Sequence, residues 1–209
     1  MLVFPKGIRH IPGFLDRDRQ ETLVEAIRSV VAEAPLYTPV MPRSGQPMSV
    51  RMTNCGTLGW VTDQERGYRY QSTHPVTGRP WPALPSMLLD IWSETSGTDI
   101  QPEACLVNYY GPEAKMGLHQ DKDERELSAP VVSISLGDAC LFRVGGVRRE
   151  ERTISFRLES GDLVVIGGEN RLAFHGVDRI YPGTSALLKR EGRINLTLRR
   201  VNPKDGPYR

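Results

Sequence analysis

From about residue 104 onward, the sequence reads as a succession of short candidate strands with turn residues between them. Paired glycines and Gly-Pro or Pro-Gly dipeptides separate these apolar runs. The expected strands cover residues 104–110, 131–136, 139–145, 153–158, 162–166, 171–175 and 192–200. Many short strands joined by such turns predict a sandwich or a barrel-like double sheet.

The first hundred residues follow a different pattern. Apolar residues at helical spacing predict helices over 16–34 and 84–96, which end before Pro35 and Gly97. The segment between them, residues 36–82, is rich in turn residues but also carries Trp60, Tyr68 and Tyr70, so we interpret it as irregular strands and loops that form a lid. The fold class is therefore α+β and mainly β, with helices against one side of the sheet.

Length and charge limit the alternatives. At about 150 residues per domain, 209 residues predict one domain over 1–209, with the helices and lid in about 1–100 and the core in about 101–209. A net charge of +2 excludes a histone-like polycation but permits a local basic patch. No apolar run approaches the roughly 18 residues of a membrane helix or suits a signal peptide. The three unpatterned cysteines fit reduced thiols in the cytoplasm.

One His-x-Asp triplet, His119-Gln-Asp121, follows a predicted strand and a Gly-Pro turn, so its side chains can lie at a strand end. A distant histidine, His175, ends another predicted strand. Two imidazoles and a carboxylate form the facial triad of non-haem Fe(II) oxygenases. Two alternatives remain open from these residues alone. The histidines could be separate structural residues, or the three side chains could bind catalytic zinc.

The segment 193–199 alternates without a break between apolar and polar residues, which predicts a strand. Its polar face carries Arg193, Asn195, Thr197 and Arg199. The two arginines lie about 20 Å apart at about 3.3 Å per residue, and converging side chains would leave a gap on the order of 8 Å. That gap suits a five-carbon dicarboxylate, and Asn108 and Tyr110 can add hydrogen bonds from strand 104–110. A solvated strand face is the alternative.

The order of these motifs resembles the AlkB-type Fe(II)/2-oxoglutarate dioxygenases. The likeness covers about residues 50–200 and runs through MTNCGTLGW (52–60), GYRY (67–70), RPWPALP (79–85), ACLVNYYGPEAKMGLHQDKDE (104–124), PVVSISLG (130–137), SGDLVVIGGENRLAFHG (160–176) and GRINLTLRR (192–200). It implies a double-stranded β-helix, or jelly roll, with an N-terminal nucleotide-recognition lid.

The resemblance also implies residue roles. The iron ligands would be His119, Asp121 and His175. The 2-oxoglutarate contacts would be Asn108, Tyr110, Arg193, Asn195 and Arg199, with Arg193 and Tyr110 at the distal carboxylate and Arg199 nearer the metal. The substrate contacts would be Trp60, Tyr68, Lys115, Asp123 and Arg149.

Among these substrate contacts, Trp60 would stack on the base opposite His119, and Asp123 would face the base. Tyr68, Lys115 and Arg149 would contact backbone phosphates, although Arg148 or Arg152 could replace Arg149 in this highly charged loop. Core packing is the alternative for Trp60 and Tyr68. Beside Asp123, the charged run Glu124-Arg125-Glu126 is expected to be a solvated turn.

The activity implied is oxidative demethylation of 1-methyladenine and 3-methylcytosine in DNA, with RNA as a further candidate. Fe(II) would be the cofactor, and 2-oxoglutarate and O2 would be consumed as cosubstrates. Formaldehyde, succinate and CO2 would be released. Both methylated bases are cationic, so the Asp123 carboxylate would attract them. Both also pair poorly, which lowers the free-energy cost of flipping the base out of a duplex. We expect a monomer that prefers single strands. A dioxygenase acting mainly on RNA and a non-catalytic nucleic-acid-binding module are the alternatives.

Five further basic residues near the C-terminus are open to two interpretations. They form a nucleic-acid-facing patch or a solvated tail, and they are Lys189, Arg190, Arg200, Lys204 and Arg209.

Overall fold

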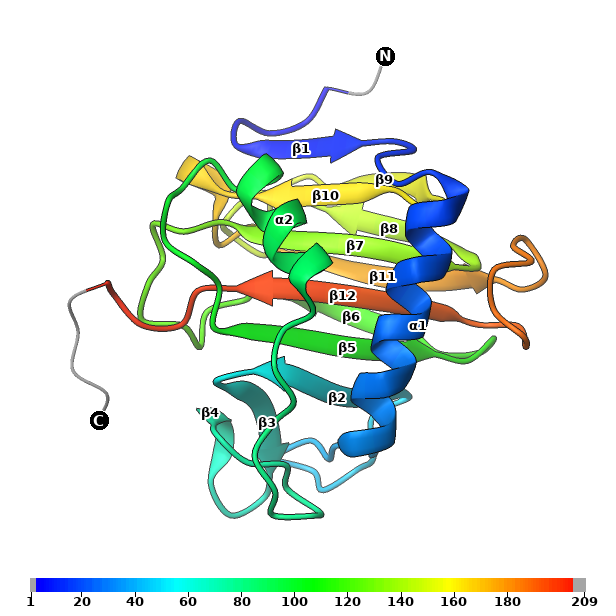
Figure 1. Ribbon diagram of the computed structural model, residues 1–209. Coiled ribbons are helices and arrows are strands. Elements are labelled where there is room, and N and C mark those ends of the chain that lie inside the picture. Colours follow the sequence, from blue (N-terminus) through cyan, green and yellow to red (C-terminus); the bar gives the residue numbers. More distant parts are fainter. Residues whose placement is uncertain (1–2, 205–209) are drawn as a thin grey trace.

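Two antiparallel sheets lie face to face in the computed structural model, which describes residues 3–204 (Figure 1). The major sheet has the strand order β1-β10-β7-β12-β5-β2. Its strands are β1 (Ile8–Ile11), β10 (Leu163–Ile166), β7 (Val131–Gly137), β12 (Arg193–Arg199), β5 (Ala104–Tyr110) and β2 (Val50–Gly56). The minor sheet contains β6 (Met116–His119), β11 (His175–Tyr181), β8 (Ala139–Val144) and β9 (Ile154–Leu158). Apolar side chains from both sheets fill the space between them, so the predicted jelly roll is confirmed.

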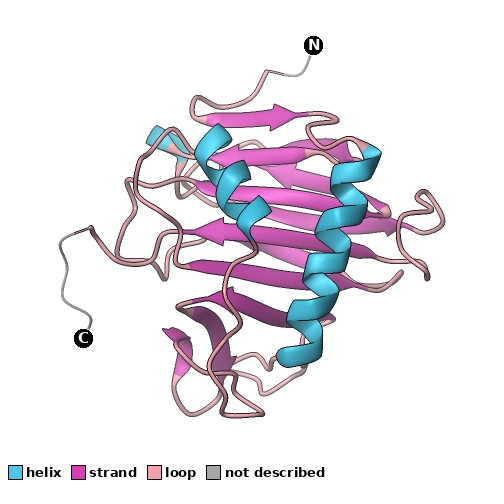
Figure 2. Ribbon diagram, viewed as in Figure 1, coloured by secondary structure: helices cyan, strands magenta, loops and turns pink. Residues whose placement is uncertain are grey.

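Two helices cover the outer face of the major sheet, as Figure 2 shows. Helix α1 (Arg17–Glu33) begins after Asp16, whose side chain accepts a hydrogen bond from the Arg19 amide at 2.8 Å. Helix α2 (Ser86–Thr95) buries Leu88, Ile91 and Trp92 at helical spacing. Both predicted helices are therefore confirmed, with ends shifted by one or two residues.

Alternation along the central strands separates two environments. On β12, Leu196 and Leu198 pack under the helices, whereas the intervening polar side chains face the minor sheet. Strand β5 pairs with β12 so that Arg193 lies opposite Tyr110 and Asn195 opposite Asn108. The polar residues predicted for one pocket are thus brought together by strand register.

The lid segment contains real strands. Strand β2 joins the edge of the major sheet through β5, and β3 (Gly59–Asp63) with β4 (Gly67–Gln71) forms a separate hairpin. The hairpin lies below β2 in Figure 1. Trp60 and Tyr68 stand on its two strands.

The predicted strand 171–175 is wrong. Residues Gly168–Asn170 form a short 3-10 helix, and the strand β11 begins only at His175. Arg171 explains the difference, because its buried guanidinium donates to the carbonyl oxygens of Ala129 and Asp121 at 2.8 Å and ties this segment down as a loop. Within residues 171–174, only Phe174 exchanges backbone hydrogen bonds with a neighbouring segment, at Gly145 and Gly146.

Cys55, Cys105 and Cys140 are buried free thiols. Within residues 3–204, neither helix combines the length and the apolar character that crossing a bilayer requires.

Candidate active site

The three predicted metal ligands converge at one end of the space between the sheets. His119 ends β6 and His175 begins β11, and strand register places them opposite each other. The Nε2 atoms of His119 and His175 lie 3.9 Å and 3.8 Å from the Asp121 carboxylate oxygens. One nitrogen or oxygen from each residue lies within 4.8 Å of the others. The geometry fits one shared metal ion and does not fit two unrelated structural histidines.

Backbone hydrogen bonds orient both imidazoles. The Nδ1 atom of His119 lies 2.9 Å from the carbonyl oxygen of Gly117, and that of His175 lies 2.9 Å from the carbonyl oxygen of Ala173. An Nδ1–H that donates to a carbonyl leaves the Nε2 lone pair free for a metal. The local backbone therefore sets the tautomer that a ligand needs.

Electrostatics favour the same protonation state. Burial lowers the pKa of His175 to about 4, so its imidazole is neutral at neutral pH. Burial alone would raise the pKa of Asp121, but Arg199 and the two histidines hold it well below its usual range. The Asp121 carboxylate, the neutral imidazole of His175 and the imidazole of His119 suit a divalent cation and leave coordination positions open.

Arg193 is a buried cation with incomplete hydrogen bonding. Its side chain is 1% exposed, and its Nη2 donates to Ser135 Oγ at 2.7 Å. Its Nε and Nη1 have no partner among the described residues, nor has the Oδ1 of Asn108. Burial raises the pKa of Tyr110, which keeps its hydroxyl protonated as a donor. These groups fit a carboxylate of a small molecule held between the sheets.

Arg199 lies nearer the triad, where the sequence predicted it, but its charge is already paired. Its Nη2 lies 2.8 Å from Asp121 Oδ1, and its Nη1 donates to the Tyr70 hydroxyl at 3.2 Å. Asn195 donates to Ser133 Oγ at 2.7 Å and lies beside Asn108. The direct contacts of Arg199 and Asn195 with 2-oxoglutarate stay predictions.

A buried polar network beside the triad was not predicted. Glu124 is 6% exposed and accepts hydrogen bonds from Arg171 Nη2 at 3.1 Å and from the Tyr70 hydroxyl. The expectation of a solvated turn is therefore wrong for Glu124. Its partners Tyr70 and Arg171 both lie in motifs that resemble the AlkB-type dioxygenases, which is the one sequence signal for this network. Within the charged run itself, nothing distinguishes Glu124 from its neighbours.

The predicted base-stacking residues also lie together. Trp60 and Tyr68 stack with ring centroids 5.5 Å apart and an interplanar angle of 21°. The Trp60 indole Nε1–H donates to Asp123 Oδ2 at 2.7 Å. Tyr68 is 46% exposed, whereas Trp60 is half-buried and packs against the edge of the apolar cluster between the sheets.

Two of the three predicted phosphate contacts are basic residues, Lys115 and Arg149, and both are exposed. Lys115 immediately precedes β6, and Arg149 reaches back to that strand by donating to the carbonyl oxygen of Leu118 at 3.2 Å. Arg148 instead pairs with Glu151 at 3.1 Å. The structure thus favours Arg149 over Arg148 as the free cation beside the triad.

Comparisons with known proteins agree with this geometry. The model of the 2OG-Fe(II) oxygenase superfamily matches residues 7–199. The "Alpha-ketoglutarate-dependent dioxygenase AlkB homolog" of Caulobacter vibrioides (strain NA1000 / CB15N) is 53% identical over 190 residues, covering 91% of this chain and 86% of that protein. The Arabidopsis thaliana "DNA N(6)-methyladenine demethylase ALKBH1C" is 38% identical over 227 residues, covering 94% of this chain and 49% of that protein. The solved structure of OsALKBH1 superposes with a TM-score of 0.78 at 32% identity, covering 95% of this chain and 99% of that one.

Proposed function

Because the chain belongs to the 2OG-Fe(II) oxygenase superfamily as an AlkB-type dioxygenase, we propose that it demethylates 1-methyladenine and 3-methylcytosine in DNA. Its cofactor is Fe(II), its cosubstrates are 2-oxoglutarate and O2, and its reaction is the oxidative demethylation of alkylated nucleic acids. The choice of these two bases is the proposed part.

The observation that carries this proposal is the convergence of His119, Asp121 and His175 on the inner face of the sheets. The same inner face carries Arg193, whose unpaired N–H groups suit the distal carboxylate of 2-oxoglutarate. In the proposed assignment, the triad holds Fe(II), and Tyr110 and Asn108 complete the carboxylate site. Asn195 and Arg199 line the pocket toward the metal.

The chemistry that the bound metal and cosubstrate supply is oxidation of a methyl C–H bond by O2, coupled to conversion of 2-oxoglutarate into succinate and CO2. The hydroxymethyl product then loses formaldehyde and leaves the unmodified base. The protein must hold the methyl group beside the metal and limit water. The buried Arg199 and Glu124 network fixes Asp121 and connects it to the lid through Tyr70.

Base recognition rests on the lid. Trp60 offers an aromatic surface, and Asp123 offers a carboxylate that attracts a cationic methylated ring. Tyr68, Lys115 and Arg149 are exposed, which supports assigning them the contacts with backbone phosphates. A cationic base also pairs poorly, so it is extruded at lower cost than an intact base.

The proposal also covers the preferred form of the nucleic acid, the oligomeric state and the location of the protein. With a net charge of +2 we propose single strands rather than tightly wrapped duplex as the preferred substrate. We also propose a monomer, organised as one domain and located in the cytoplasm. RNA with the same lesions is the second candidate substrate, because the proposed contacts read the base and the phosphates.

The experiment compares single-stranded oligonucleotides that carry one 1-methyladenine or one N6-methyladenine. The protein is loaded anaerobically with Fe(II) and 2-oxoglutarate and then exposed to air, and methyl loss, formaldehyde and succinate are measured by mass spectrometry. We expect iron-dependent loss of the ring-nitrogen methyl group in preference to the neutral N6 adduct. Preference for the N6 adduct would contradict the role of charge. Succinate without methyl loss would redirect the search to another substrate, and neither product would favour a binding module.

His119→Ala is the matched loss-of-ligand variant, because the His119 side chain is 40% exposed and its removal should leave the fold intact. We expect it to lose both products. Retained turnover with normal metal binding would contradict the ligand assignment.

A further inference from the structure

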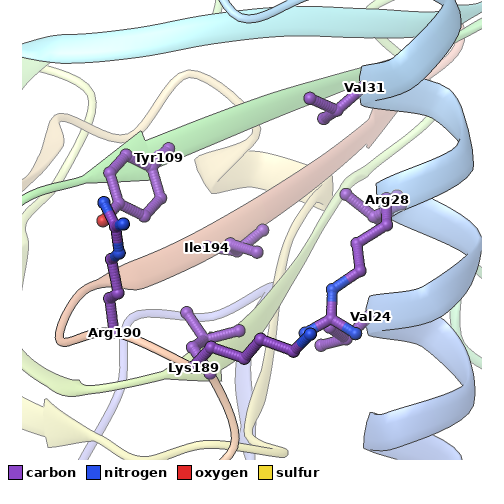
Figure 3. Close-up of a pocket in the computed structure, with 9 residues that line it drawn as sticks. Val24, Arg28, Val31, Tyr109, Lys189, Arg190 and Ile194 are labelled. Carbon is purple, nitrogen blue, oxygen red and sulfur yellow. The ribbon is translucent and has the colours of Figure 1, made fainter.

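A second concave site lies on the opposite face of the major sheet from the triad. It is a groove of about 340 Å³ between α1, the outer face of β5 and β12, and the loop that precedes β12 (Figure 3). This volume is within the range of roughly 300–1,000 Å³ that small-molecule sites occupy. No part of the proposed demethylase site uses it.

The groove has an apolar floor and a cationic rim. The floor consists of aliphatic side chains and one tyrosine ring, namely Val24, Ile27, Val31, Tyr109, Leu188 and Ile194. The rim consists of Arg28, Lys189 and Arg190. A ligand that matches both parts needs an apolar body and a negatively charged end.

The rim cations lack sufficient countercharge. Arg28 pairs with Glu25 one turn away at 2.9 Å, on an exposed helix surface. Neither Lys189 nor Arg190 forms an ion pair with any residue in 3–204. Figure 3 shows the Lys189 side chain extending toward the Arg28 guanidinium and Arg190 standing beside the Tyr109 ring. Like charges that converge over an apolar floor repel each other until an anion lies between them.

The nearest acidic residue in the sequence does not fill this role. The Glu191 side chain reaches toward Gly183, with its Oε1 3.4 Å from the position of a Cβ there, and Glu191 does not line the groove. Its backbone carbonyl accepts the hydroxyl of Tyr109 at 3.2 Å. That hydrogen bond fixes the Tyr109 ring as part of the floor.

The wall of the groove is held in place before any ligand arrives. The buried Asp138 carboxylate accepts hydrogen bonds from the Ser185 amide at 3.1 Å and from the Gly192 amide at 2.7 Å. These bonds anchor both ends of the loop that carries Leu188, Lys189 and Arg190. A preorganised wall reduces the entropy lost on binding.

We propose that this groove binds an amphipathic monocarboxylate, such as a medium-chain fatty-acid anion. The apolar tail would lie against Val24, Val31 and Ile194, and the carboxylate would lie among Arg28, Lys189 and Arg190. Nucleic acid fits less well, because a phosphate backbone would meet the cations but gain nothing from the apolar floor. The inference goes beyond the proposed function and does not depend on it.

The test uses decanoate as the probe and decanol as the uncharged control with the same tail. The protein is loaded with Fe(II) and saturating 2-oxoglutarate without oxygen, so that decanoate cannot bind in the cosubstrate pocket. The Ile194 methyl resonance, assigned with Ile194→Val, reports occupancy. We expect saturable shifts with decanoate and at least tenfold weaker binding of decanol.

Charge reversal at the exposed rim distinguishes this site from general attraction to a basic protein. Lys189→Glu/Arg190→Glu should weaken decanoate binding at least tenfold and leave decanol unchanged. Lys6→Glu/Arg66→Glu makes the same charge change at exposed positions elsewhere and should bind normally. Circular dichroism checks that all variants are folded.

Three results would overturn the proposal. They are the absence of saturable binding, equal affinity for decanoate and decanol, and unchanged decanoate affinity in Lys189→Glu/Arg190→Glu. A single-stranded oligonucleotide that displaces decanoate at the Ile194 methyl would assign the groove to nucleic acid instead.

Discussion

At the scale of single residues, Arg193 is expected to lower the stability of the protein while it serves cosubstrate binding. A buried guanidinium with two unpaired nitrogens destabilises the cosubstrate-free protein, because each unsatisfied group costs about 1–3 kcal/mol. In the proposed assignment, the same nitrogens donate charge-assisted hydrogen bonds to 2-oxoglutarate. A residue selected mainly for stability would show neither feature.

Arg193→Met should therefore leave the unfolding free energy without cosubstrate unchanged or raise it by about 1 kcal/mol. The dissociation constant for 2-oxoglutarate should rise roughly 100-fold, which corresponds to about 2.7 kcal/mol. Thermal unfolding with and without 2-oxoglutarate measures both quantities. The control is Arg157→Met, at an exposed residue that pairs with Glu159 and lies over the Tyr181 ring. A large loss of stability without cosubstrate would show that Arg193 is structural.

Asp123 tests recognition of charge at the same scale. Asp123→Asn keeps the shape and one acceptor for Trp60 but removes the negative charge. At about 4 Å, that charge contributes about 1–4 kcal/mol toward a cationic base, depending on exposure. We expect kcat/KM for 1-methyladenine to fall at least fivefold and that for neutral N6-methyladenine to change little. Equal losses on both oligonucleotides would contradict electrostatic selection.

At the scale of elements, α1 supports the major sheet from outside and does not reach the triad. Its start depends on the Asp16 cap. Asp16→Ala should cost about 1 kcal/mol, or roughly 2–4 °C in Tm for a chain of this length. Asp16→Asn keeps a capping oxygen and should lose less than half as much. Activity at 25 °C should be the same in both variants, and lost turnover in folded Asp16→Ala would show that α1 couples to the active site.

Elements were predicted best where apolar and polar residues alternate along a strand that packs against different surroundings on its two faces. Strands β5 and β12 match the predictions to within a residue, because every second side chain contacts the helix-covered core and the others line the pocket. Strand β1 was not predicted, since four residues at a sheet edge carry too little pattern. The apolar run 171–174 was misassigned, because only the structure shows that Arg171 anchors it as a loop.

The site was predictable where chemistry restricts residue type. Few side chains bind Fe(II), so a His-x-Asp triplet and one distant histidine made the triad a candidate. The resemblance to AlkB-type dioxygenases then selected iron over zinc and over structural histidines. Glu124 could not be found in this way, because a charged run does not show which carboxylate meets a buried arginine. Its partner Arg171 lies 47 residues away, and only the fold brings the two together.

At the scale of the whole molecule, a net charge of +2 leaves substrate binding dependent on a few local cations. If Lys115 and Arg149 are the cationic phosphate contacts, two counterions are released. The logarithm of the association constant should then fall with the logarithm of salt concentration at a slope of about −1.4 for a single strand. Fluorescence anisotropy of a labelled oligonucleotide between low and moderate salt measures this slope.

Variants decide which cations produce the slope. Lys115→Ala/Arg149→Ala should bring it close to zero, whereas Arg148→Ala should leave it unchanged, because Arg148 already pairs with Glu151. A slope much steeper than −1.4 that survives in Lys115→Ala/Arg149→Ala would assign phosphate binding to other basic residues. The basic residues near the C-terminus would then be tested next, namely Lys189, Arg190, Arg200 and Lys204, whereas Arg209 lies outside the described residues. Arg200 is the least suitable of them, because its guanidinium pairs with Glu103 at 3.4 Å and donates to the Asn202 carbonyl oxygen. A steep slope would therefore point first to the other three.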